Sequence, residues 1–164
     1  MRRSKFSALT STLGLALTSA LALTSGLSSC DRKTIYHHYE HTPIAGWEKN
    51  DTLVFTLPRS KMRAVVKRDV EMRISGDYPY QRLFLIVEQT IFPANIARRD
   101  TLNCLLIDSD GNIQGDGVSL YQYRFHMSDI SLNEGDSLQI CIRHNMKREI
   151  LPGIADVGIR LTSY

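Results

Sequence analysis

Apolar and polar residues alternate with a period of two over most of the chain after residue 47, and this pattern limits the fold more than any other feature. Such alternation is typical of β-strands with one face in a core and one face in solvent. It is clearest in the stretch 121–127, where aromatic residues and a methionine occupy every second position. The pattern predicts strands at residues 53–57, 70–75, 83–87, 102–107, 121–127, 138–142 and 157–161.

The spacing of these strands indicates how they pair. Parallel neighbours need a crossover of about a dozen residues or more, which the short connections do not supply. No long stretch of the mature sequence shows a helical period. We therefore predict an all-β fold of about seven or eight strands, an antiparallel β-sandwich of the immunoglobulin-like or jelly-roll-like type. A single curled sheet or barrel is the alternative that the pattern leaves open.

Two short polar stretches predict tight turns between strands. The sequence DSDGN at residues 108–112 follows an apolar run, and its Asp-Gly pair favours a hairpin because glycine adopts positive φ at little cost. It resembles a calcium-binding loop only loosely, since its glycine is misplaced and no glutamate closes the loop. The second turn is NEGD at residues 133–136.

The first 29 residues have the layout of a secretory signal peptide. Two arginines and a lysine at the N-terminus precede a run from residue 6 to residue 29 that contains no charged side chain. The run ends in the motif LSSC at residues 27–30, which resembles the lipobox of bacterial lipoproteins. We therefore predict that Cys30 is lipidated, and several acyl chains on it would hold the protein firmly at a membrane. An uncleaved transmembrane helix is the alternative, since the run is long enough to span a bilayer.

Cleavage before Cys30 would leave a mature chain of two parts. Residues 30–46 are polar and without period, so we predict a tether that lays Tyr36 or Tyr39 on the edge of the domain. Residues 47–164 form the predicted β-sandwich domain. The mature chain has 17 basic and 17 acidic residues, because three of the 20 Lys and Arg lie in the signal peptide. This balance argues against nucleic acid as a partner and gives no net attraction to anionic lipid beyond the acyl anchor.

The mature chain offers no residue pattern that predicts catalysis or a cofactor. Three histidines at positions 37, 38 and 41 would bind a metal only on a rigid backbone, and their place in the tether predicts solvated side chains. Cys104 and Cys141 are predicted to be separate thiols, with a disulfide as the alternative that an oxidising envelope permits. No serine lies in a nucleophile elbow, and no glycine-rich loop precedes a helix. We therefore predict no enzymatic activity, no cofactor, no metal and no small-molecule substrate.

Aromatic side chains are the feature that would suit a glycan-binding module, because sugar rings stack on exposed aromatic faces. Tyr78 and Tyr80 flank Pro79 in a loop between two predicted strands, and Trp47 is the one tryptophan of the chain. Trp47, Tyr78 and Tyr80 are therefore the candidate binding patch. Packing into the core is the competing role for Trp47, given the large area that a tryptophan buries.

Four segments of the mature chain, with the lipobox, together resemble one known family. They are Trp47 followed by D-x-L-x-F at residues 51–55, YPY-x-x-L-x-L at 78–85, D-x-L-x-x-x-L-x-D-x-x-G at 100–111, and LPGIADVGIRL at 151–161. In these segments the chain is similar to the gliding-motility lipoprotein GldH family of the Bacteroidota.

The resemblance implies a small lipoprotein without enzymatic activity or cofactor, needed by the gliding apparatus and linked to protein secretion by the same cells. Its expected partners are other envelope proteins and the membrane that holds its lipid. Residues 31–33, directly after Cys30, carry one acid and two bases, whereas surface-exported lipoproteins of this phylum tend to have an acidic cluster there. We therefore expect a lipid anchor in the outer membrane, with the domain facing the periplasm. The family also occurs in non-gliding members of the phylum, where its role would be envelope maintenance or secretion.

Overall fold

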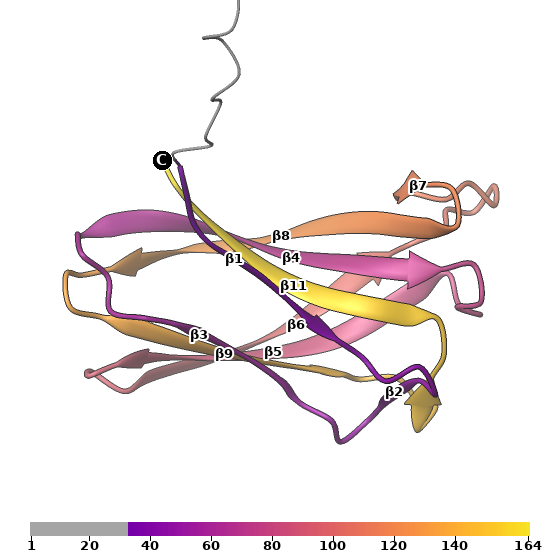
Figure 1. Ribbon diagram of the computed structural model, residues 1–164, viewed down its shortest axis with the longest axis horizontal. Coiled ribbons are helices and arrows are strands. Elements are labelled where there is room, and N and C mark those ends of the chain that lie inside the picture. Colours follow the sequence, from indigo (N-terminus) through magenta and orange to yellow (C-terminus); the bar gives the residue numbers. More distant parts are fainter. Residues whose placement is uncertain (1–32) are drawn as a thin grey trace, which may run out of the picture. The chain divides into compact units, whose positions relative to one another are not determined.

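Eight strands of five or more residues follow one another in the part of the chain that the computed structural model describes, residues 33–164 (Figure 1). Three further strands have two residues each. In chain order they are β1 (Thr34–His41), β2 (Trp47–Glu48), β3 (Leu53–Leu57), β4 (Ala64–Ser75), β5 (Arg82–Phe92), β6 (Ile96–Leu105), β7 (Asp116–Gly117), β8 (Leu120–Leu132), β9 (Ser137–His144), β10 (Ile150–Leu151) and β11 (Ile154–Ser163).

Two antiparallel sheets pack face to face. The first has five strands in the order β1-β11-β4-β8-β7, and the second has four in the order β3-β9-β5-β6. In Figure 1 the main strands of the first sheet form the upper layer and those of the second sheet the lower layer. Strands β2 and β10 pair separately at one end. The predicted antiparallel β-sandwich is thus confirmed. Among the described residues, no helix has the length and hydropathy needed to cross a membrane.

The core lies between the sheets and consists of the inward positions that the alternation predicted. Val70, Met72 and Ile74 of β4 are buried, as are Leu85 and Val87 of β5. A buried arginine forms polar contacts across this core: Arg68 of β4 donates a hydrogen bond to Gln89 of β5 and lies 3.9 Å from the carboxylate of Asp100 in β6. Arg68 Nε also donates to the carbonyl oxygen of Ser128 at 2.8 Å, which satisfies a further donor away from water.

The domain begins earlier than the sequence predicted. Residues 34–41, expected to belong to a polar tether, form strand β1 and pair with β11 from Thr34 opposite Thr162 to His41 opposite Asp156. The predicted boundary at residue 47 is therefore wrong, and the sandwich starts at residue 34. The alternation was hidden because polar or aromatic side chains occupy both faces of this edge strand.

The two predicted turns lie where the sequence placed them. Asp108 accepts hydrogen bonds at its Oδ1 from the backbone N–H groups of Asp110 at 2.9 Å and Asn112 at 2.8 Å. Ile107 and Ile113 on either side form an antiparallel bridge, so this stretch is a hairpin turn. Residues 133–136 connect β8 to β9, with Gly135 at a φ of +87°.

Candidate functional site

Several charged side chains lie buried on the outer face of the first sheet, the face turned away from the core. Asp69 and Glu71 of β4 alternate with the core residues Val70 and Met72 and therefore lie on the face opposite the core. Both are buried, and Glu71 is 0% exposed. Longer side chains from the neighbouring strands cover them. We call this set of acids and their partners the outer-face network.

Glu71 is the centre of the outer-face network. Its Oε2 accepts a hydrogen bond from the Tyr39 hydroxyl at 2.5 Å and lies 2.8 Å from Nε2 of His37, while Arg124 Nε donates to its Oε1 at 2.7 Å. Burial raises the pKa of this carboxyl group. The hydrogen bonds from Tyr39, His37 and Arg124 outweigh burial, so the net effect lowers the pKa below its ordinary value. Glu71 is therefore an anion at neutral pH.

A glycine of β11 makes room for Tyr39. The two residues are paired across β1 and β11, and a Cβ atom on Gly158 would lie 2.6 Å from Cδ1 of the tyrosine ring. The ring can therefore lie across β11 and reach Glu71 on the next strand. Burial and the hydrogen bond to Glu71 raise the pKa of Tyr39 to about 12. On its other side the ring meets the guanidinium of Arg73, whose Cζ lies 4.4 Å from the ring centroid.

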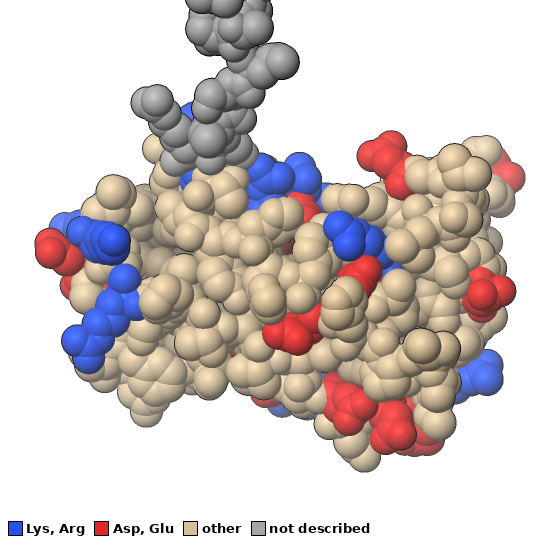
Figure 2. Space-filling model, viewed as in Figure 1, with Lys and Arg blue, Asp and Glu red and all other residues tan. Residues whose placement is uncertain are grey.

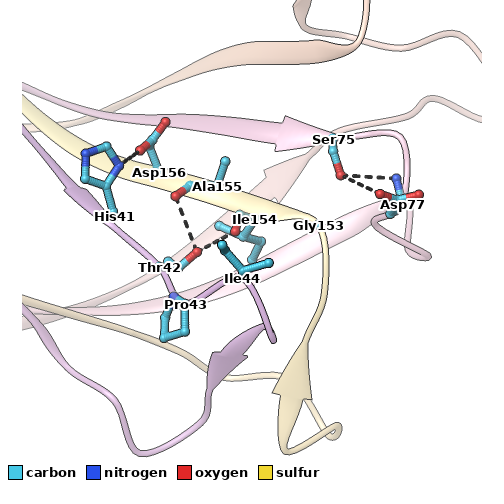
Figure 3. Close-up of a pocket in the computed structure, with 10 residues that line it drawn as sticks. All are labelled: His41, Thr42, Pro43, Ile44, Ser75, Asp77, Gly153, Ile154, Ala155 and Asp156. Atoms are coloured by element: carbon cyan, nitrogen blue, oxygen red, sulfur yellow. Dashed lines mark hydrogen bonds and ion pairs between the residues drawn. The ribbon is translucent and has the colours of Figure 1, made fainter.

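The outer-face network continues to the end of β1 through Asp156. This buried carboxylate pairs with Nη1 of Arg73 at 3.5 Å and with Nδ1 of His41. His41 and Asp156 form one side of an open groove of about 490 Å³ (Figure 3). Ser75 and Asp77 lie at the far side of this groove.

Two hydrogen bonds to β11 fix the position of Thr42, which lines the groove. Its buried hydroxyl donates to the carbonyl oxygen of Ile154 (Figure 3), and its backbone N–H donates to the carbonyl oxygen of Ala155 at 3.1 Å. Ile44 in the same loop is fully exposed beside the groove. The groove therefore combines a fixed polar wall with an apolar side chain that has no cover within residues 33–164.

A second acid of β4 anchors the other end of the outer-face network. Asp69 Oδ1 lies 3.1 Å from Nδ1 of His126, and its Oδ2 lies 3.9 Å from the Lys67 ammonium. His126 also contacts Asp129 at 3.5 Å. Each buried acid thus has cationic or hydrogen-bonding partners that reach solvent, which satisfies the acid and fixes the orientation of the partners.

This arrangement suits binding better than proton transfer or metal coordination. Within residues 33–164, no three histidine, cysteine or acidic side chains converge in a way that would hold a metal ion. What reaches solvent is a row of oriented donors, above all the guanidinium groups of Arg73 and Arg124. Their planar N–H groups match carboxylate and carbonyl acceptors of a partner.

Comparison with known proteins places the chain in a family. Residues 34–161 match the model of the GldH lipoprotein family. The chain belongs to the GldH lipoprotein family. It is 29% identical over 142 residues to the gliding motility lipoprotein GldH of Flavobacterium johnsoniae, covering 82% of this chain and 88% of that protein. It is also 29% identical over 143 residues to a GldH homolog of Christiangramia forsetii, covering 82% and 86%. The family that the motifs indicated is thereby confirmed.

Solved structures are less similar. The Eiger TNF structure from S. frugiperda is 11% identical, aligns with 81% of this chain and 94% of its own, and has a TM-score of 0.36. A TM-score this low shows no shared fold, and the sandwich of this GldH-family chain is defined by its own strand pairing.

The aromatic residues of the predicted binding patch do not form a surface in this GldH-family chain. Trp47 is wholly buried, and its Nε1 donates to the carbonyl oxygen of Asp51 at 3.1 Å. Tyr78 is 7% exposed and donates from its hydroxyl to the carbonyl oxygen of Arg82 at 3.0 Å. Of the three, Tyr80 alone is exposed, at 36%. Trp47 and Tyr78 belong to the core, so no stacking platform for a sugar exists there.

The C-terminal family motif at residues 151–161 helps to build that core. Its Pro-Gly pair at residues 152–153 lies between β10 and β11, where Gly153 has a φ of +81°. A Cβ atom on Gly153 would lie 2.6 Å from the backbone N of Tyr78. The glycine is therefore needed both for the turn and for the close approach to the loop that holds Tyr78. Gly158, in the same motif, makes room for Tyr39.

The remaining predicted residues have separate positions. Cys30, the predicted lipidation site, lies outside the described residues. Cys104 and Cys141 are both free, as expected, and burial raises the pKa of the Cys104 thiol to about 12. His38 pairs with Glu40 at 3.0 Å in a solvent-exposed contact. The side chains of His37 and His41 are exposed to solvent as expected, and they also contact the buried acids Glu71 and Asp156.

Proposed function

We propose that this protein is a non-catalytic, lipid-anchored component of the gliding machinery that acts by binding other envelope proteins. Membership of the GldH lipoprotein family and the name of the Flavobacterium relative support a role in the gliding machinery. The motif LSSC supports an anchor on Cys30. The absence of an acidic cluster in residues 31–33 supports the periplasmic face of the outer membrane.

The outer-face network is the proposed contact surface. The observation that carries this proposal is that Tyr39, Arg73 and Arg124 reach solvent while buried acids hold them in place. Tyrosine and arginine are among the residue types that dominate binding energy at protein interfaces. Side chains that are already ordered lose little conformational entropy on binding. A lipid anchor adds to this effect, because it raises the effective concentration of the domain for neighbours in the same membrane.

Crosslinking in cells tests the proposal. The lipidated protein is crosslinked in its native envelope, purified, and its partners identified by mass spectrometry. We expect Arg73→Ala combined with Arg124→Ala to remove most captured partners. The matched control replaces Arg99 and Arg143, two arginines on the outer face of the second sheet, and should leave capture intact. Folding of both variants is checked by urea unfolding.

Two further outcomes are informative. Cys30→Ala should release the protein from the membrane fraction and lose the same partners. An unchanged set of partners in the Arg73 and Arg124 variant, with the fold intact, would contradict the outer-face network as the contact surface. Equal loss in the control variant would contradict it as well, because the effect would then not be specific to one face.

A further inference from the structure

A partly apolar hollow lies at the end of the sandwich where the described chain begins. Ile35, the second residue of β1, lines a hollow of about 290 Å³ together with residues 57–62 and 64, from the end of β3 to the beginning of β4. Ile35 is exposed, and Met62 at the tip of the connection is 61% exposed. We call Ile35 and residues 58–63 the β3–β4 tip. Its two large apolar side chains remain exposed among the described residues.

The β3–β4 tip is also basic. Arg59, Lys61 and Arg63 are exposed, and the ion pairs of the described residues all involve other side chains. In Figure 2 Lys and Arg side chains gather at the left-hand end of the view, where Figure 1 places this connection. Three cations that have no acidic partner among residues 33–164 therefore lie next to an exposed methionine.

Two acids of the neighbouring turn reduce this positive charge without cancelling it. Glu134 and Asp136 lie in the connection from β8 to β9, and the backbone N–H of Ser60 donates to the carbonyl oxygen of Asp136 at 2.7 Å. The Asp136 carboxylate is occupied within its own turn, where it accepts from the backbone N–H of Asn133 at 2.8 Å. The three basic side chains of the tip still outnumber the two acidic side chains of this turn. The equal numbers of bases and acids in the mature chain hide this local excess.

The short chain between Cys30 and β1 limits how far this end of the domain can lie from the membrane. Cys30 precedes Lys33 by three residues, which span at most about 11 Å even when fully extended. Lys33 is bound to the domain, because its carbonyl oxygen accepts from the N–H of Ser163 at 2.8 Å. Acyl chains on Cys30 would therefore hold the beginning of β1, and with it Ile35, close to the headgroups of the membrane.

We propose that the β3–β4 tip docks on the surface of the lipid bilayer that holds the anchor. Met62 and Ile35 enter the interfacial region, while Arg59, Lys61 and Arg63 pair with lipid phosphates. Apolar side chains flanked by bases are typical of segments that lie in a membrane interface. Docking at this end fixes the orientation of the domain and leaves the outer-face network free. The proposal rests on lipidation of Cys30, as proposed above.

Fluorescence quenching from within the bilayer tests the docking. The full lipidated protein is reconstituted in vesicles of phosphatidylethanolamine with some phosphatidylglycerol, with a polarity-sensitive dye on Met62→Cys. The matched control carries the dye on Val118→Cys, which is 91% exposed and lies beside β7, at the opposite end of the domain in Figure 1. Both proteins also carry Cys141→Ser, so that the half-buried native thiol is not labelled. Quenchers on the lipid acyl chains should reduce the signal at position 62 and leave that at position 118 unchanged.

A charge variant sharpens the test. Arg59→Ser combined with Lys61→Ser keeps the dye at position 62 in place but removes two cations, each of which should change the ratio of docked to undocked protein about fivefold. We expect the quenching at position 62 to fall accordingly, and to fall less in vesicles of neutral phosphatidylcholine, where it starts lower. Equal quenching in the charge variant and the parent protein would overturn the contribution of lipid phosphates.

The readouts separate this proposal from the one on which it rests. The mass of the N-terminal peptide from the same sample reports acylation of Cys30. Equal quenching at positions 62 and 118 with acylation confirmed overturns docking and leaves the lipid anchor standing. A protein occupant would protect position 62 from water-soluble quenchers in cell envelopes without lipid quenching in vesicles, which also overturns docking. An unmodified Cys30 overturns both proposals.

Discussion

The two outer faces of the sandwich carry similar charged residues but bury them to different extents. On the first sheet Glu71 is 0% exposed and has three partners within hydrogen-bonding distance. On the second sheet the side chain of Glu88 is 45% exposed, and its contacts are Arg99 at 3.3 Å and Arg143 at 4.0 Å. Both glutamates alternate with core residues along their strands. The same pattern in the sequence thus yields one structural anion and one ordinary surface charge.

The difference arises from the neighbouring strands. Tyr39 of β1 crosses Gly158 of β11 to reach Glu71, and Arg124 approaches from β8 on the other side. The cover of Glu71 therefore comes from residues far apart in the sequence. Glu88 has two arginines as neighbours, and their contacts leave its side chain 45% exposed. Burial of a charge on a sheet is thus a property of cross-strand neighbours and not of the strand alone.

The largest effect should come from removing the two glutamates in turn. Glu71→Ala breaks several hydrogen bonds to a charged group and should lower the free energy of unfolding by about 2–3 kcal/mol. Glu88→Ala should change it by less than about 0.5 kcal/mol, because exposed ion pairs contribute little. Urea unfolding of both variants measures the difference. Equal losses would show that the two faces do not differ energetically.

Acid should remove part of the Glu71 contribution. Its pKa in the folded protein is below the ordinary value of 4.5, so the charged form stabilises the fold above that pH and the benefit disappears as the pH falls through the folded pKa. Glu71→Gln is neutral at every pH and lacks this dependence. The gap in stability between wild type and Glu71→Gln should therefore be full at neutral pH and narrow below about pH 4.5. A gap independent of pH would contradict the structure.

A smaller effect should follow from filling the space over β11. Gly158→Ala would place a methyl group against the Tyr39 ring and force the ring away from Glu71. We expect a loss of about 1 kcal/mol, at the low end of the range for overpacking, because the ring can move towards solvent. The control is Gly158→Ala in the Tyr39→Ala background. No ring is present there to clash with the added methyl group, so Gly158→Ala should be nearly neutral. Additive losses in the double variant would argue against this contact.

The smallest effect should be on the second sheet. Arg99→Ala removes the ion pair with Glu88 between two exposed side chains and should change the stability by less than about 0.5 kcal/mol. The change should shrink further at high salt, because exposed charges are screened. A loss comparable to that of Glu71→Ala, measured in the same urea titration, would remove the contrast between the faces.

The alternation in the sequence predicted much of the fold. It located seven of the eight main strands, although the stretch predicted at 102–107 covers only the last four residues of β6, because the first part of that strand is mostly exposed. It missed β1, in which histidines, tyrosines and a glutamate occupy both faces of an edge strand. The hairpin at residues 108–112 was also predictable, since a local Asp-Gly signal is enough to specify such a turn.

The candidate site was much less accessible to prediction. Burial of Glu71 depends on Tyr39 and Arg124, whose places beside it follow from strand order and register and not from the local sequence. One signal was present, because an isolated glycine within a strand such as Gly158 indicates close approach of another group. Trp47 and Tyr78 were candidates for a surface patch because the sequence does not show whether an aromatic residue near a loop is exposed or packed into the core. Their burial follows from the packing of the two sheets.

Strand β1 also has a mechanical consequence. Its first residues adjoin the proposed anchor on Cys30, and its outward side chains Tyr39 and His41 belong to the proposed contact surface. A partner that pulls on this surface would therefore transmit tension to the membrane through one eight-residue strand. Tension along the strand axis loads its hydrogen bonds to β11 in shear, all at the same time, whereas tension across the axis would open them one after another. The direction of traction relative to β1 would then decide how much force the domain bears before it unfolds.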